Sequence, residues 1–268
     1  MQRKYFRNLM TLAIVAVASI CFTNASASAA LVMVDSAVMP FNTTANTPAN
    51  FDSAGSDKLI VTVGTENKNG GPNHNISGVT FGGVPMVLGA SQSGLGTGDQ
   101  GGVVIYYLDN PVGVGDVVFQ VGGENGGFVT VSSWAGTLPG LGATSNAANN
   151  AGTISLATTA AGSTVLAAFE NSGNTANAGT PTPDAPLQLI ASGPWARNWG
   201  SSAAGYEEMV GVGVQNYSFT SNASNYAYKL AAVEILSANA GGGVPEPATA
   251  TLALLGLGGL MMRRRRNA

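Results

Sequence analysis

The stretch Val79-Thr-Phe-Gly-Gly-Val-Pro-Met-Val-Leu88 consists of two short apolar runs on either side of a pair of glycines. Val79 to Phe81 and Val84 to Leu88 have the length of β-strands and contain β-branched residues, which strands favour. Gly82 and Gly83 adopt positive φ without a steric penalty, as a tight hairpin turn requires. The stretch therefore predicts two strands joined by a hairpin.

The same alternation of short apolar runs and turn residues continues along the chain. Asn110-Pro111 ends one run, and Gly113 to Asp116 turns into the next. Runs at this spacing are typical of an antiparallel β-sandwich. Leu166 to Phe169 and Leu230 to Ile235 have some helix propensity, but their β-branched neighbours and strand-length spacing favour strands. The further predicted strands are Leu59 to Val63, Val103 to Leu108, Val117 to Val121, Phe128 to Trp134, Ile154 to Leu156, Thr164 to Phe169, Leu187 to Ala191, Met209 to Val214 and Tyr226 to Leu236.

Composition indicates a folded chain. Of 268 residues, 45% are apolar and 9% are charged, which argues against intrinsic disorder, and the length suits one domain or two small ones. Between the basic clusters at the two ends, four basic residues face fourteen acidic ones, a net charge of −10. Those four are Lys58, Lys68, Arg197 and Lys229. Without a basic stripe we expect no nucleic acid partner.

The N-terminus predicts a secretory signal peptide over residues 1–30. Arg3, Lys4 and Arg7 precede an apolar stretch from Leu9 to Phe22, and small residues follow. Signal peptidase would cut near Ala27 or Ala30; an uncleaved anchor is the alternative. Cys21, the only cysteine, leaves with the signal, so we expect the exported chain to form no disulfide and no thiolate metal site.

The C-terminal residues 241–268 contain a second short apolar stretch, Ala248 to Met262, followed by arginines. Fifteen helical residues rise about 22 Å against roughly 30 Å of hydrocarbon, so this is a marginal membrane helix. Basic residues flank both terminal stretches on their outer sides. The positive-inside rule then keeps these flanks cytoplasmic and places the chain between them outside.

This tail resembles the PEP-CTERM sorting signal of Gram-negative, biofilm-forming bacteria. The matching residues are Val244, Pro245, Glu246 and Pro247, then the apolar stretch, then Arg263, Arg264, Arg265 and Arg266. The resemblance implies recognition by an exosortase, a membrane-embedded cysteine protease that processes its substrates near the motif. The two prolines also suit a protease site, because they keep the segment extended. An ordinary tail anchor is the alternative.

Asp57 to Val121 also resembles a β-sandwich module of bacterial secreted and phage-associated proteins. The similar segments are Lys58 to Val63, Val79 to Met86, Ile105 to Pro111 and Gly115 to Phe119. The resemblance implies a jelly-roll-like sandwich and no activity. We therefore expect an all-β fold, an antiparallel β-sandwich over residues 31–240.

Catalytic chemistry has few candidate residues. His74 is the only histidine and lies between two asparagines in a glycine-rich loop, so we interpret it as a solvated loop residue rather than a base. Glu207-Glu208, or Asp109 with Asp116, are carboxylate pairs of the kind that glycosidases use. Adjacent strand residues point to opposite faces, however, so Glu207 and Glu208 would not converge. We expect no enzymatic activity and no cofactor.

Two binding hypotheses remain. Asp99, Asp109 and Asp116 offer oxygen ligands for Ca²⁺, but they lack any calcium-motif spacing, so we predict no metal site. In Trp195-Ala-Arg197-Asn-Trp199, an extended backbone would place Trp195, Arg197 and Trp199 on one face. That face would either contact carbohydrate or cap a core.

Together these patterns predict an exported protein that is transiently anchored in the inner membrane, processed by an exosortase and delivered to the cell surface or the extracellular polysaccharide. Its role would be structural or adhesive. The competing hypothesis is a carbohydrate-binding module whose aromatic platform holds Trp195 and Trp199.

Overall fold

The structure of the protein is a computed structural model that describes residues 30–42, 49–66, 74–94, 101–121, 126–172, 180–195, 200–221 and 228–239. None of these residues belongs to a helix long and apolar enough to cross a membrane. The predicted apolar helices, Leu9 to Phe22 and Ala248 to Met262, lie outside them.

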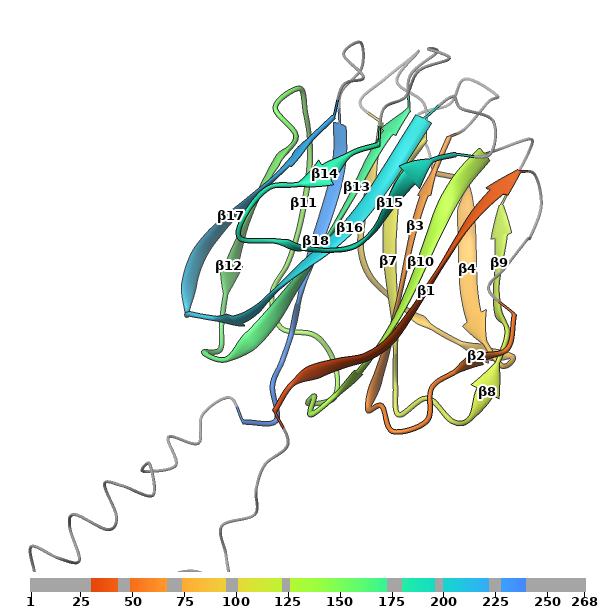
Figure 1. The fold of residues 1–268 in the computed structure, drawn as a ribbon, viewed down its shortest axis with the longest axis vertical. Coiled ribbons are helices and arrows are strands. Elements are labelled where there is room, and N and C mark those ends of the chain that lie inside the picture. Colours follow the sequence, from red (N-terminus) through yellow and green to blue (C-terminus); the bar gives the residue numbers. More distant parts are fainter. Residues whose placement is uncertain are drawn as a thin grey trace, which may run out of the picture.

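The first half of the chain forms two layers of antiparallel strands, which we call the N-lobe (Figure 1). Its inner sheet has the order β1 (Val32–Asn42), β10 (Gly126–Ala135), β3 (Lys58–Thr65), β7 (Gly102–Asp109) and β6 (Val87–Ser93). Its outer layer contains β5 (Val84–Pro85), β4 (Ile76–Phe81) and β9 (Val117–Val121), and the short pair β2 (Phe51–Asp52) and β8 (Val114–Gly115).

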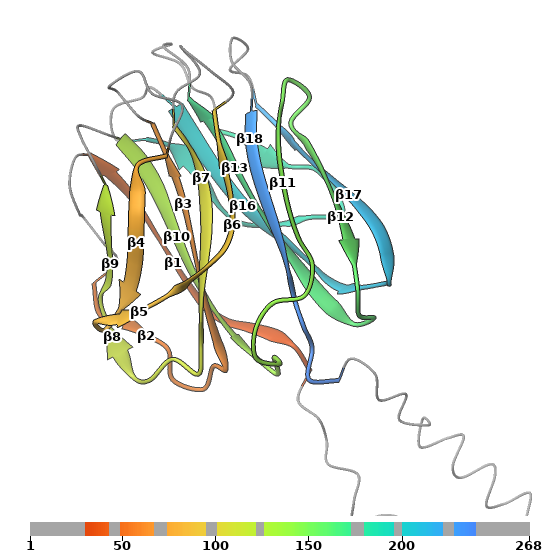
Figure 2. The ribbon, with the colours of Figure 1, turned by 180° about the vertical axis from the view of Figure 1, so that it is seen from behind.

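The second half forms the C-lobe, also in two layers (Figure 2). Its inner sheet has the order β11 (Thr144–Asn149), β18 (Tyr228–Ile235), β13 (Ser163–Ser172), β16 (Gly200–Val210) and β15 (Gln188–Pro194). Its outer layer contains β12 (Thr153–Thr158), β17 (Gly213–Thr220) and β14 (Thr182–Pro183).

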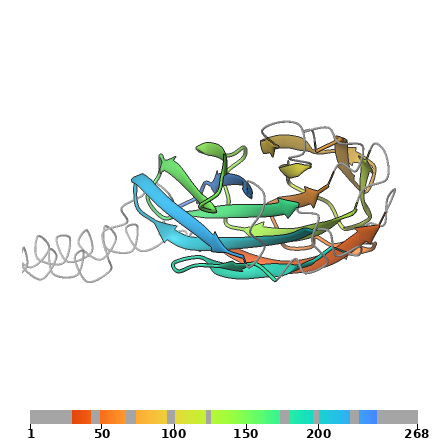
Figure 3. The same cartoon turned by 90° about the horizontal axis from the view of Figure 1, so that it is seen from above.

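The two inner sheets pack against each other, so four layers enclose three apolar cores (Figure 3). Alternation along β3 shows the arrangement: Leu59 and Val61 enter the N-lobe core, whereas Ile60 enters the core between the lobes. Trp134 and Tyr206 meet edge to face across this boundary, 5.4 Å between ring centroids. A sheet buried on both faces has apolar residues at consecutive positions, which explains the unbroken runs in β3 and β13.

The two lobes repeat one topology. Each inner sheet has the same strand order when β1, β10, β3, β7 and β6 are matched with β11, β18, β13, β16 and β15. The contacts between the lobes repeat as well. The contact of β1 with β15 corresponds to that of β11 with β6, and the contact of β10 with β16 corresponds to that of β18 with β7. The lobes are therefore related by an approximate two-fold axis.

Short stretches of sequence carry the same repeat. Val112-Gly113-Val114 and Val212-Gly213-Val214 are separated by 100 residues, and each precedes a core phenylalanine, Phe119 or Phe219, by the same interval. Both glycines have positive φ, and all four valines are exposed. Glu66 directly follows β3, and Glu170 lies near the end of the corresponding strand β13. The two halves thus share local geometry at these equivalent places.

The prediction of an antiparallel all-β protein is confirmed. Gly82 and Gly83, with φ of 54° and 81°, join β4 and β5 in the predicted hairpin. The sheets form four layers, more than the two of one sandwich, because each inner sheet buries both faces. One predicted strand is wrong: β16 ends at Val210 and β17 begins at Gly213, so Met209 to Val214 spans a turn.

Candidate functional site

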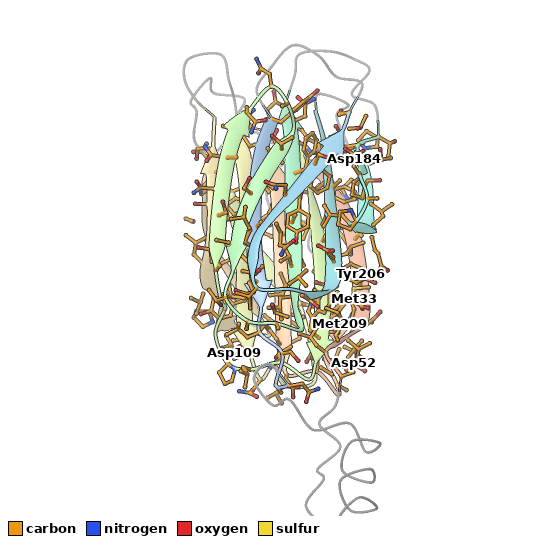
Figure 4. All side chains as sticks on the ribbon, turned by 90° about the vertical axis from the view of Figure 1, so that its left-hand side faces the viewer. Met33, Asp52, Asp109, Asp184, Tyr206 and Met209 are labelled. Carbon is orange, nitrogen blue, oxygen red and sulfur yellow. The ribbon has the colours of Figure 1, made fainter. Side chains whose placement is uncertain are left out.

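Both ends of the described chain lie at one end of the molecule. Val32 is paired with Ala135, and a little further along the chain Ala238 N donates to Gly136 O over 2.8 Å. Thr137 and Ser237 form an isolated β-bridge beside them. We call this the terminal end. Figure 4 shows Asp52 and Asp109 toward this end and Asp184 toward the opposite one.

The predicted sorting residues follow directly from the terminal end. Val244, Pro245, Glu246 and Pro247, like Arg263, Arg264, Arg265 and Arg266, lie outside the described residues. Val244 is five residues beyond Asn239, and a fully extended chain over that distance spans at most about 18 Å. The motif is therefore held close to the terminal end whatever path the chain takes.

The family model for the PEP-CTERM protein-sorting motif matches residues 243–266. The chain carries a PEP-CTERM sorting motif. The match covers the Val-Pro-Glu-Pro residues, the apolar stretch and the arginines, as the sequence predicted. A PEP-CTERM motif implies an exported protein that is sorted to the cell surface and processed by an exosortase. No curated protein and no solved structure matches the chain.

Trp195, part of the predicted carbohydrate platform, is buried. Its indole Nε1 donates to Ser202 Oγ over 2.8 Å, and its ring occupies the space where a side chain on Gly200 would lie. It packs with Phe128 of the N-lobe, so it helps to join the lobes. Its backbone N also donates to Gly200 O over 2.9 Å, next to the pairing of Pro194 with Ser201 between β15 and β16. Trp195 therefore has the structural role that we weighed against sugar binding.

The platform as a whole stays a prediction. Arg197 and Trp199 lie outside the described residues.

Asp109 and Asp116, the two candidate calcium ligands within the described residues, both form hydrogen bonds with other residues. Asp109 forms an ion pair with Lys58 and accepts from Gly140 N over 2.7 Å. Burial lowers the pKa of Lys58, while the hydrogen bond to Asp109 opposes that change. Asp116 accepts from Asn50 N over 2.9 Å, and Asp99 lies outside the described residues. Among the described side chains, no group of three or more acids, histidines or cysteines is placed to hold a metal ion.

The candidate catalytic residues have structural partners. Glu207 accepts from the hydroxyl of Tyr217 over 2.9 Å, whereas Glu208 is exposed. Burial, followed by this hydrogen bond to Glu207, raises the pKa of Tyr217, so the phenol remains a donor. His74 Nδ1 accepts from Ile76 N over 3.1 Å, and burial lowers the pKa of His74. A neutral imidazole here fixes the entry into β4.

Sequence analysis missed two buried polar groups of the C-lobe. Lys229 on β18 lies 3.4 Å from Glu170 on β13, and both side chains are fully buried. Glu234 on β18 accepts from three backbone N–H groups and two hydroxyls, those of Ala143, Thr159, Ala160 and Ser163. Only the strand register brings these partners together, and no local motif in the sequence indicates them.

Proposed function

We propose that the protein is a non-enzymatic component of the cell surface or the extracellular polysaccharide, structural or adhesive in role, that an exosortase releases from the inner membrane. Each lobe would be a jelly-roll-like sandwich that presents surface rather than a catalytic cleft. The observation that carries the proposal is the PEP-CTERM motif at residues 243–266.

The geometry of the terminal end supports this proposal. Ala248, where the apolar stretch begins, is nine residues beyond Asn239, a span of at most about 32 Å. When the tail is inserted, the terminal end therefore stays near the membrane surface. The opposite end, where Asp184 lies in Figure 4, is then free to meet partners outside the cell.

Surface charge supports a neutral partner. The described residues include two basic side chains, Lys58 and Lys229, and both are buried. Asp35, Asp52 and Glu208 are exposed. A surface with acids and without exposed cations in its described part favours neutral polysaccharide over polyanions.

Replacing Pro245, Glu246 and Pro247 together by alanine tests the sorting mechanism. We expect the variant to accumulate in the inner membrane with its tail intact, because the apolar stretch and the arginines still insert while the protease loses its recognition site. The measurement is cell fractionation with intact-mass analysis, in a host that has an exosortase. Release of the variant at the wild-type level and with the wild-type mass would contradict the proposal.

A second variant serves as the control for insertion. Replacing Arg263, Arg264, Arg265 and Arg266 by glutamine removes the topological signal and about 1 kcal/mol of surface attraction per residue. We expect this variant to pass into the periplasm unprocessed, since a 15-residue span is marginal. The arginine variant would then fail at membrane insertion and the alanine variant at cleavage, as expected if the tail is a sorting signal.

A further inference from the structure

The N-lobe contains a cleft of about 570 Å³ between its outer layer and its inner sheet. Val79 and Phe119 of the outer layer form one wall, and Tyr106 and Leu88 of the inner sheet form the other. This volume lies within the range of small-molecule sites, roughly 300 to 1,000 Å³.

The cleft is open because the outer layer ends early on this side. Its edge strand β5 has two residues, Val84 and Pro85, and proline lacks the N–H that would continue a ladder. Met86 then crosses from the outer layer to the inner sheet, with its N–H donated to Val79 O over 2.9 Å. The inner strands β6 and β7 extend beyond this short edge, which leaves part of the apolar interior accessible.

The polar group of interest in the cleft is the Tyr106 hydroxyl. Tyr106 is only 7% exposed, yet its hydroxyl makes no hydrogen bond with any residue that the structure describes. The hydroxyl oxygen is not one of the described polar atoms that are buried without a partner, so it is open to the cleft, where water or a ligand is able to accept its hydrogen bond. Burial raises the pKa of Tyr106, so the phenol is protonated and able to donate at neutral pH.

The C-lobe has no such unpaired group at the equivalent position. Tyr106 lies opposite Val61 on β3, and the matching residue of the C-lobe, opposite Val165 on β13, is Glu207. Glu207 already accepts a hydrogen bond from Tyr217. The hydroxyl that is open to the cleft is therefore a feature of the N-lobe and not a requirement of the shared topology.

We propose that this cleft binds a neutral, mainly aliphatic small molecule with one hydroxyl or carbonyl oxygen, which accepts a hydrogen bond from Tyr106. The described lining includes no charged side chain, so a ligand charge would be desolvated without a partner. The described lining of the cleft has three side-chain hydroxyls, those of Tyr106, Ser77 and Thr80. A sugar ring would bury more hydroxyl groups than these three can hydrogen-bond. An aliphatic chain fits the apolar walls.

Photolabelling of the full chain with a diazirine analogue of 1-decanol tests the proposal. We expect labelled peptides to contain Met86 or Tyr106, and unlabelled decanol in excess to suppress the labelling. Tyr106→Phe removes only the hydroxyl, and should weaken competition by decanol about five- to tenfold while leaving competition by decane unchanged.

Gly78→Phe tests the location. Gly78 lines the cleft, its φ is outside the left-handed region, and a Cβ there would meet no atom within 4 Å. The added ring should close the cleft and abolish specific labelling, and Leu88→Trp, at the mouth, should do the same. Gly211→Phe is the matched control, because a Cβ on Gly211 also meets nothing within 4 Å and the residue lies far away in the C-lobe.

Three outcomes would overturn the proposal. The first is labelling that is confined to the C-terminal tail. The second is labelling that persists in both a folded Gly78→Phe variant and a folded Leu88→Trp variant. The third is decanol that competes equally well in Tyr106→Phe and in the wild type. Circular dichroism of each variant shows whether it is folded.

Discussion

At the scale of single residues, Glu234 shows how a buried charge is stabilised without a cation. Its side chain is fully buried, and five hydrogen bonds from Ala143, Thr159, Ala160 and Ser163 surround the carboxylate. Burial alone raises its pKa, but these hydrogen bonds outweigh it, so the pKa lies below the usual 4.5.

Glu234→Gln should therefore destabilise the protein by about 3 kcal/mol. An amide offers one acceptor oxygen where the carboxylate offers two, and its NH₂ group faces N–H donors. The measurement is urea denaturation at pH 7. Glu208→Gln is the matched control, since Glu208 is exposed on the neighbouring region of the same lobe, and it should change stability by less than about 0.5 kcal/mol.

The effect should also depend on pH with a definite sign. Because the folded-state pKa of Glu234 is lowered, its contribution is complete above the unfolded value near 4.5 and is lost as the pH falls through the folded value. The stability gap between wild type and Glu234→Gln should narrow below about pH 4.5. A gap that stays constant down to pH 3 would show that the carboxylate is not the stabilising form.

The sequence predicts the roles of single residues less well than it predicts the strands. Trp195 was singled out from the sequence, but its burial depends on Gly200 and on Phe128 of the other lobe, which no local pattern indicates. The importance of Tyr106 was not foreseen, because a tyrosine in an apolar run looks like any core residue. Both depend on tertiary neighbours rather than on spacing.

At the scale of strands, turn residues made the fold largely predictable. The Gly82-Gly83 pair placed a hairpin correctly because both positions have positive φ, which glycine accepts without strain. Consecutive apolar residues located β3, β7, β10, β13 and β18. The edge strand β11 was missed because it contains only small and polar residues, so that only pairing with a neighbour makes it a strand. The edge strand β1 was missed too, although it is rich in valine and methionine.

Gly83→Ala should cost about 1 to 2 kcal/mol. Its φ is 81°, and a Cβ there would meet no atom within 4 Å, so the cost is conformational strain and not collision. Gly78→Ala is the control, with equally open space and no positive φ, and should be close to neutral. Guanidinium denaturation of both variants measures the difference. Equal stabilities would mean that the hairpin does not need glycine.

At the scale of the whole molecule, the repeat of one topology explains why the sequence predicted one sandwich where the protein has two stacked lobes. The similarity between the halves is confined to short stretches such as Val112-Gly113-Val114 and Val212-Gly213-Val214. Two five-stranded sheets pack against each other only if the outward faces of both are apolar; otherwise these faces remain in contact with water. That is a property of paired surfaces, and strand-by-strand analysis does not show it.

The shared core predicts that the lobes unfold together. Ile60 and Ile105 from the N-lobe and Leu166 and Val233 from the C-lobe are fully buried in the layer between the inner sheets. Unfolding one lobe would expose the apolar face of the other, at roughly 25 cal/mol for each Å² uncovered. We therefore expect one cooperative thermal transition of the chain.

Two matched variants test this cooperativity. Leu59→Ala creates a cavity in the N-lobe core and Leu156→Ala creates one in the C-lobe core, and each should cost about 2 to 5 kcal/mol. If the lobes form one unit, either change lowers the same single midpoint, by about 5 to 15 °C, although the two sites share no core. Differential scanning calorimetry makes the measurement. Independent lobes would instead give two transitions, with each variant moving only the transition of its own lobe.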